Sequence, residues 1–323
     1  MSEPTFFAAI RMAAASVAED AEFVRINDDR LAAYAAELEL AGLPPPTYDR
    51  EHHFWGSPED TVAFQLTLDS INFGSGYFPH LRKIPGKSGY HTIALCLKEW
   101  WDEEGPLPGD RLRTFTPEDA TLIFFQKIGG RGPAQELMGL FAQALNDLGQ
   151  WLGERYDDDF LAPVAEAGGS AACLAESLTA MPFYRDVSRH RGRAVPLYKR
   201  AQIAVTDLAI AFDNAGPGAF HDLDDLTIFA DNLVPHVLRV DGVLDYDPAL
   251  LARINAEELI EAGSPEEVEI RAVALHAVER LVSALRASGV TTSARHLDYL
   301  LWNRGGGQMY KAQPRHRTRT VFY

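Results

Sequence analysis

Ser264-Pro265-Glu266-Glu267 opens the stretch that decides the fold of this chain. Serine is a preferred N-cap residue, proline fits the first helical position, and acidic side chains favour the positive end of the helix dipole. The apolar residues that follow recur every three or four positions, which predicts an amphipathic helix. These residues are Val268, Ala272, Leu275, Val278 and Val282. The same start recurs at Ser57-Pro58-Glu59-Asp60 and at Thr116-Pro117-Glu118-Asp119, so we expect helices there as well.

Helical periodicity continues along most of the chain, and alternating strand patterns are scarce. One short extended piece is expected at residues 320–323. Further helices are predicted over residues 30–40, 61–71, 134–152, 199–212, 226–239, 248–254 and 292–302. The sequence therefore predicts an all-α fold of about a dozen helices. We expect a single domain over residues 1–323, built as one or two helical lobes.

Composition limits the classes of partner. The chain has 323 residues and a formal net charge of −16, which opposes binding to duplex nucleic acid. Its first residues carry no basic patch ahead of their apolar run, and no apolar run is long enough to span a bilayer, so a cytoplasmic protein without membrane contact is expected. Cys96 and Cys173 lie in apolar helical patterns. They are interpreted as buried thiols, with a disulfide as the alternative.

Asp231 is the lone carboxylate of an apolar run, residues 226–239, and it lies four residues before Pro235. Proline cannot donate to the carbonyl four residues back, so we expect a kinked helix with an unsatisfied acceptor at Asp231. A carboxylate beside such a kink is costly to bury without a partner. The alternative is a structural Asp231, bonded to local backbone or to Lys199 or Arg239.

Asn72, Phe73 and Ser75 belong to a segment in which a predicted helix runs into Gly74-Ser75-Gly76. Glycines on both sides of Ser75 allow the backbone to approach a ligand closely, and the neighbouring aromatic rings could line one wall of a site. A helix end with core aromatics is the alternative. The spacing matches neither a phosphate loop nor a serine nucleophile.

Two stretches, residues 185–200 and 304–323, each carry a net charge of +5 in this acidic chain. They are either solvated surface or cations gathered for a small anion. His53, beside Phe54 and Trp55, is suited to stacking or hydrogen bonding with a heterocycle. No metal is predicted, because no ligand spacing accompanies His52 and His53.

Six blocks in order along the chain resemble the queuosine salvage protein family, whose members are queuosine 5'-phosphate N-glycosylase/hydrolases. The blocks are Leu68-Asp69-x-x-Asn72-Phe73, Lys199-Arg200-Ala201-Gln202-Ile203, Phe229-Ala230-Asp231-x-x-Val234-Pro235-x-Val237-Leu238-Arg239, Glu269-Ile270-Arg271-Ala272, Leu297-Asp298-Tyr299-Leu300-Leu301-Trp302 and His316-Arg317-Thr318-Arg319. The resemblance implies a fold similar to the helix-hairpin-helix DNA glycosylases, with no cofactor. It also implies hydrolysis of queuosine 5'-phosphate to the free base queuine and ribose 5-phosphate, for salvage into tRNA modification.

Under this resemblance, Asp231 is the candidate catalytic residue, because a carboxylate near C1' stabilises an oxocarbenium-like sugar, activates water or forms a transient ester. The base is a 7-deazapurine without an N7 to protonate, so stabilisation of the sugar carries more of the rate. Asp298 is the candidate partner for the amine of the cyclopentenediol arm. Lys199, Arg315 and Arg317 are candidates for the 5'-phosphate. The remaining substrate-binding candidates are His53, Asn72, Phe73, Ser75, Phe229, Tyr299, Trp302 and Asn303, with Phe229 and Trp302 as plain core in the alternative.

Two other function classes stay open at this stage. A base-excision DNA glycosylase would share the fold, although the net charge opposes duplex binding. A non-catalytic helical nucleotide-binding or scaffold protein would leave Asp231 structural. The sequence leaves the oligomeric state open.

Overall fold

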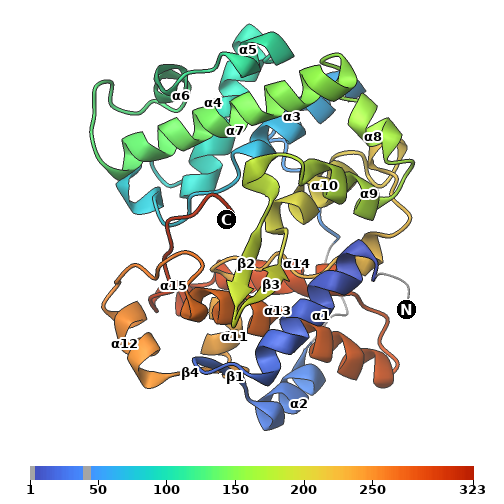
Figure 1. The fold of residues 1–323 in the computed structure, drawn as a ribbon, viewed down its shortest axis with the longest axis vertical. Helices are drawn as coiled ribbons and strands as arrows, with labels where there is room; N and C mark the ends of the chain where they lie inside the picture. Colours follow the sequence, from blue (N-terminus) through green and yellow to red (C-terminus); the bar gives the residue numbers. More distant parts are fainter. Residues whose placement is uncertain (1–3, 39–44) are drawn as a thin grey trace. The chain divides into compact units, whose positions relative to one another are not determined.

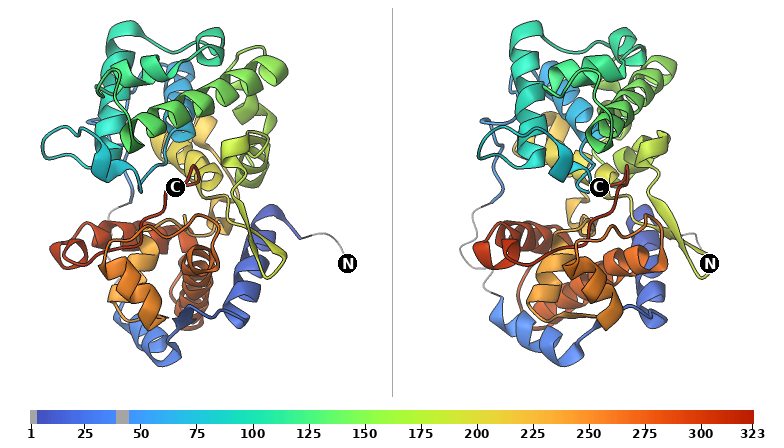
Figure 2. Two further views of the ribbon diagram at one scale, coloured as in Figure 1. Left: turned by 60° about the vertical axis from the view of Figure 1, so that its left-hand side comes forward. Right: turned by 90° about the vertical axis from the view of Figure 1, so that its left-hand side faces the viewer.

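The structure is a computed structural model that describes residues 4–38 and 45–323 (Figures 1 and 2). The chain folds into two compact units, each assembled from segments that are distant in sequence. Unit 1 comprises residues 1–46, 186–199 and 222–319, and unit 2 comprises residues 47–185, 200–221 and 320–323. The single functional domain over residues 1–323 stays a prediction.

The three predicted helix starts are confirmed. Ser57 Oγ accepts a hydrogen bond from Asp60 N–H, and Ser264 Oγ accepts one from Glu267 N–H, at 3.1 and 3.3 Å. At Thr116 the capping is reciprocal, because Asp119 also accepts from the Thr116 N–H. Each start thus satisfies N–H groups that the helix itself leaves without partners.

Unit 1 is built around α13, a helix of 23 residues that packs against α1, α2 and α11 (Figure 1). Every residue from Glu267 to Leu275 is buried, so α13 is enclosed on all sides over these residues rather than amphipathic as predicted. The helices of unit 1 are α1 Phe6–Glu19, α2 Asp28–Glu37, η4 Leu223–Asp225, α11 Val234–Val240, α12 Pro248–Asn255, α13 Pro265–Ala287, α14 Ala294–Gly305 and α15 Gln308–Lys311.

Unit 1 also holds four short strands that the sequence pattern did not predict. β1 Val24–Ile26 pairs antiparallel with β4 Leu244–Tyr246, and β2 Val187–His190 pairs antiparallel with β3 Arg193–Pro196. The expected extended piece at residues 320–323 is not a strand. Its last residue, Tyr323, is buried, and the Tyr323 carbonyl accepts a hydrogen bond from Gly74 N–H at 2.9 Å.

Unit 2 has helices joined by loops and no strand among its described residues, and it is organised by the 24-residue helix α7, which packs against α5, α6 and α3. Phe141 on α7 meets Phe73 and Phe124 edge to face, with ring centroids 5.2 and 5.4 Å apart. The elements of unit 2 are α3 Pro58–Ser70, η1 Phe78–His80, α4 Gly89–Glu104, α5 Gly109–Arg113, α6 Pro117–Ile123, α7 Pro133–Tyr156, α8 Ala162–Glu166, α9 Ala171–Leu178, η2 Pro182–Tyr184, α10 Lys199–Ala211 without its first residue, and η3 Gly216–Gly218.

Within residues 4–38 and 45–323, no helix combines the length and the apolar character that a bilayer crossing requires.

Candidate active site

Asp231 lies in a non-helical segment, residues 226–233, and the predicted kinked helix is wrong. The helix α11 begins at Val234, so Pro235 falls in its first turn, where proline is tolerated because the missing N–H would have no helical partner. Asp231 Oδ1 accepts hydrogen bonds from Leu233 N–H at 2.7 Å and Val234 N–H at 3.4 Å. The half-buried carboxylate therefore bonds the backbone just before and at the start of α11, and the local backbone bonding given as an alternative does occur.

Asp298, on α14, is a buried neighbour of Asp231 in unit 1. Its Oδ1 accepts a hydrogen bond from Phe229 N–H at 2.8 Å, which ties α14 to the segment that carries Asp231. Burial, helped by the Asp231 charge, raises the pKa of Asp298 to about 7, although the Phe229 hydrogen bond and Lys199 act in the opposite direction. Among the described residues, Phe229 N–H is the one hydrogen-bond partner of this carboxyl.

The raised pKa predicts how Asp298 affects stability. Between the ordinary carboxyl value of 3.8 and about 7, the folded state holds a proton that the unfolded state releases. The stability that this group contributes therefore falls as pH rises through that window, by an amount on the order of 2–4 kcal/mol. Asp298→Asn stays neutral and escapes this loss. Urea unfolding of both proteins at pH 5 and pH 7.5 measures this. The free energy of unfolding of the variant should rise relative to that of the wild type between the two pH values, and an equal pH dependence in both proteins would contradict the raised pKa.

Two of the three predicted phosphate cations have the Asp231–Asp298 pair as electrostatic neighbours. Lys199 begins α10, is buried, and interacts with Asp298. Arg315 interacts with Asp231, and desolvation lowers its pKa although part of the residue stays open to solvent. Arg317 is differently placed, because its Nη2 donates to the Glu257 carbonyl at 2.9 Å and lies 3.1 Å from the Glu257 carboxylate.

The aromatic candidates of unit 1 are not plain core. Phe229 and Tyr299 are half-buried, and Trp302 is 44% exposed. Tyr299, Trp302 and Asn303 follow Asp298 on α14, where the Asn303 amide donates to the Tyr299 carbonyl at 2.7 Å. Rings with open faces next to a buried carboxyl are suited to stacking on a planar base.

The Gly-Ser-Gly segment in unit 2 follows the helix-end alternative. The helix α3 ends at Ser70, and Gly74 adopts a positive φ of 99°. Phe73 and Tyr77 are buried, so these rings pack in the core of unit 2 instead of lining an open wall. Asn72 and Ser75 stay partly exposed, and the Asn72 amide lies 3.4 Å from Asp69 Oδ1.

His53, also in unit 2, lies among aromatic rings as predicted. Its Nε2 is 2.9 Å from the Tyr90 hydroxyl, and its ring centroid is 5.4 Å from that of Tyr48. Burial lowers the pKa of His53 to about 4, so the imidazole is neutral at physiological pH and can accept or donate one hydrogen bond.

Asp49, His52 and His91 come within metal-ligand range of one another, with ligand atoms at most 4.8 Å apart. Sequence spacing does not indicate this group, because His91 lies on α4 whereas Asp49 and His52 lie in the turn before α3. His52 Nδ1 lies 2.7 Å from Asp49 Oδ2 and its Nε2 lies 2.8 Å from Lys87 Nζ. Both ring nitrogens of His52 thus have protein partners, which accounts for the cluster without an ion.

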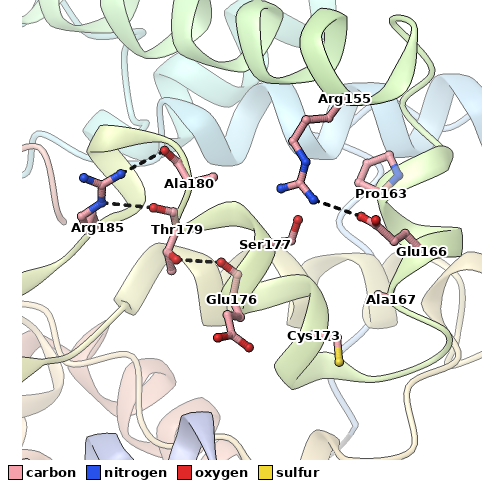
Figure 3. A pocket seen from close by; sticks show the side chains of 10 residues that line it. All are labelled: Arg155, Pro163, Glu166, Ala167, Cys173, Glu176, Ser177, Thr179, Ala180 and Arg185. Atoms are coloured by element: carbon pink, nitrogen blue, oxygen red, sulfur yellow. Dashed lines mark hydrogen bonds and ion pairs between the residues drawn. The ribbon is translucent and has the colours of Figure 1, made fainter.

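A surface pocket in unit 2 contains none of the predicted site residues (Figure 3). In it, Arg155 faces Glu166, and Arg185 donates to the backbone carbonyls of Thr179 and Ala180 (Figure 3). Cys173 lines this pocket and is exposed, so the prediction of two buried thiols is wrong for Cys173 and confirmed for Cys96. Both cysteines are free thiols, with Cys96 buried and Cys173 exposed on α9, so the disulfide given as the alternative is not present.

The basic stretch 185–200 divides between surface and core. Arg191 pairs with Glu22, and Arg193 pairs with Asp20 on the surface of unit 1. Arg200 is buried in unit 2, where its guanidinium donates to the carbonyls of Ser70 and Phe183. Within the stretch, Lys199 is thus the buried cation that neighbours the acidic pair.

Comparisons with known proteins give one consistent result. The family model described as "Queuosine salvage protein" matches residues 52–323. A relative from Sphaerobacter thermophilus, named queuosine 5'-phosphate N-glycosylase/hydrolase, is 40% identical over 312 residues that cover 95% of this chain and 95% of the relative. Relatives of the same name from Dictyostelium discoideum and Mus musculus are 36% and 35% identical, covering 82% and 83% of this chain and 79% and 83% of their own lengths.

Proposed function

The chain belongs to the queuosine salvage protein family, and we propose that Asp231 is the catalytic carboxylate with which it hydrolyses the N-glycosidic bond of queuosine 5'-phosphate. The products are the free base queuine and ribose 5-phosphate. Relatives from bacteria and eukaryotes that align over most of their length and are named as this enzyme support this reaction.

The observation that carries the assignment is a pair of neighbouring carboxyl groups in unlike environments. Asp298 is buried with a pKa near 7, whereas Asp231 is half-buried at the start of α11. Environments that separate two carboxyl groups in this way are typical of sites in which each has its own role. Asp231 is the more exposed of the two carboxyl groups.

In the proposed reaction, the bond between C1' and the base nitrogen breaks with its electron pair on the base. Water adds to C1', and its proton ends on the base nitrogen. Positive charge develops on the sugar as the bond lengthens, because the 7-deazapurine departs without protonation at N7. The Asp231 charge stabilises that cation, whether the carboxylate also activates the water or forms a transient ester.

Asp298 is proposed to bind the secondary amine on the cyclopentenediol arm of the base. Its second oxygen is left for a ligand, because the first is held by Phe229 N–H. A cationic amine favours the ionised carboxyl, so binding should lower the pKa of Asp298 from about 7. Phe229, Tyr299 and Trp302 then stack on the base, with Asn303 on the same helix as Tyr299 and Trp302 as a further contact. The candidates in unit 2, His53, Asn72, Phe73 and Ser75, stay predictions.

Lys199 and Arg315 are proposed to hold the 5'-phosphate, and Arg317 is the weaker candidate because Glu257 already engages it. A dianion gains from charge-assisted hydrogen bonds of this kind. The likeness to the helix-hairpin-helix glycosylase fold, the cytoplasmic location and the lack of duplex binding remain parts of the proposal, the last supported by the net charge of −16.

The proposal is tested by incubating the protein with queuosine 5'-phosphate and following free queuine by chromatography. We expect queuine and ribose 5-phosphate in equal amounts. A parallel titration with fluorescent duplex DNA should show no saturable binding at physiological salt. Saturable duplex binding without queuine release would instead favour a DNA glycosylase, and the absence of both would favour a non-catalytic protein.

A further inference from the structure

We propose that Asp186 and Arg271 are positioning residues that hold Lys199 and Asp231 at fixed positions relative to each other. The inference rests on the proposed function, because it concerns the placement of the two groups assigned there to the phosphate and the sugar. It is drawn from a chain of buried hydrogen bonds within unit 1 that the reaction itself does not use.

Arg271, on α13, holds the backbone next to Asp231. Its Nε donates to the Ala230 carbonyl at 2.8 Å, and the residue is 1% exposed. Ala230 lies in the non-helical segment 226–233, where no helical ladder fixes the backbone. The Arg271 bond to Ala230 and the Asp298 bond to Phe229 therefore fix two consecutive residues before Asp231.

Asp186 receives the other end of the same guanidinium. Its Oδ1 accepts from Arg271 Nη1 at 3.0 Å and its Oδ2 from Arg271 Nη2 at 2.6 Å, a two-bond fork that fixes the plane of both groups. Asp186 Oδ2 also accepts from Lys199 N–H at 3.2 Å. A continuous series of hydrogen bonds thus runs from the Ala230 carbonyl through Arg271 and Asp186 to the Lys199 N–H.

The backbone at Tyr198, the residue before Lys199, is strained, which indicates that contacts with Asp186 hold it in place. Tyr198 has a φ of 47°, in the left-handed region that a residue with a Cβ rarely adopts. The Asp186 carbonyl accepts from Tyr198 N–H at 3.3 Å and from Leu197 N–H at 2.9 Å. Strained residues held by several contacts are typical of functional sites, and here the strain directly precedes Lys199.

Arg271→Lys tests the positioning role, because lysine keeps the charge and loses the planar fork. In the folded variant, kcat for queuosine 5'-phosphate should fall about tenfold as Asp231 shifts. The preference for the monophosphate over the free nucleoside should also shrink, because Lys199 is no longer held in place through Asp186. A purely structural pair would leave that preference unchanged.

Arg280→Lys is the matched control, since Arg280 lies on the same helix and pairs with Asp28 at the surface. It should keep both the wild-type kcat and the wild-type substrate preference. Folded Arg271→Lys with kcat and preference within twofold of wild type would overturn the inference. So would a loss of activity that merely follows the unfolded fraction measured by circular dichroism.

The double variant Asp186→Leu/Arg271→Met decides the matter if the single variant does not fold. The double replacement removes both charges of the fork together, and Glu267, whose Oε1 lies 3.5 Å from Arg271 Nη1, keeps its hydrogen bond from Gly263 N–H, so the fold should survive. The inference predicts a folded double variant with reduced kcat and reduced monophosphate preference, and wild-type kinetics would overturn it. Wild-type protein that releases no queuine would instead overturn the proposed function.

Discussion

Lys199→Ala should lower kcat/KM for queuosine 5'-phosphate by about 10- to 100-fold, the scale of one charge-assisted hydrogen bond to a dianion. The free nucleoside lacks the phosphate, so its kcat/KM should fall much less. The expectation follows from the placement of Lys199, a buried cation at the start of α10 that interacts with Asp298. Steady-state kinetics on both substrates, at low and high salt, measure the difference.

Lys311→Ala is the control for this prediction, because Lys311 belongs to the other basic stretch and is exposed. It should leave the ratio of monophosphate to nucleoside turnover unchanged. Arg315→Ala should lower that ratio more than Arg317→Ala, whose guanidinium Glu257 engages. Equal losses on both substrates in Lys199→Ala would place the phosphate elsewhere.

The helices could be predicted because their signals are local. An N-cap hydroxyl, a proline and an acid within four residues satisfy the helix start without any distant partner, and all three such starts are observed. The strands could not be predicted in the same way. β1 pairs with β4 across more than 200 residues of sequence, and each is 3 residues long, too short for alternation to be visible.

The segment around Asp231 shows where local rules are ambiguous. Proline either kinks a helix or starts one, and the apolar run before Pro235 favoured the first interpretation. The observed start at Val234 depends on Asp298 and Arg271, which bond the backbone of residues 229 and 230 from distant helices. Sequence spacing alone does not predict that Asp298 and Arg271 bond to this segment.

The sequence supplied candidates for the site but not for the residues proposed to position it. A lone carboxylate in an apolar run made Asp231 a candidate, and the family resemblance added Asp298 and Lys199. The positioning roles proposed for Asp186 and Arg271 were not predicted, because each depends on a partner 85 residues away. A usable signal existed, since Asp186 is the lone acid within the basic stretch 185–200.

The central claim is that the negative charge of Asp231 drives cleavage of the glycosidic bond, and Asp231→Asn removes that charge alone. Asparagine retains an oxygen that can accept from Leu233 N–H, now 2.7 Å from Asp231 Oδ1, so α11 should keep its start and the protein its fold. Asp224→Asn, at an exposed acid of the same unit, is the control for charge removal.

The decisive measurement is the rate of queuine release from bound queuosine 5'-phosphate, with enzyme in excess and product followed by chromatography. Asp231→Asn should release queuine at least about 100-fold more slowly than the wild type, the scale of losing one group that stabilises transition-state charge. Asp224→Asn should match the wild type. A folded Asp231→Asn protein that binds the substrate and releases queuine at the wild-type rate would contradict the account.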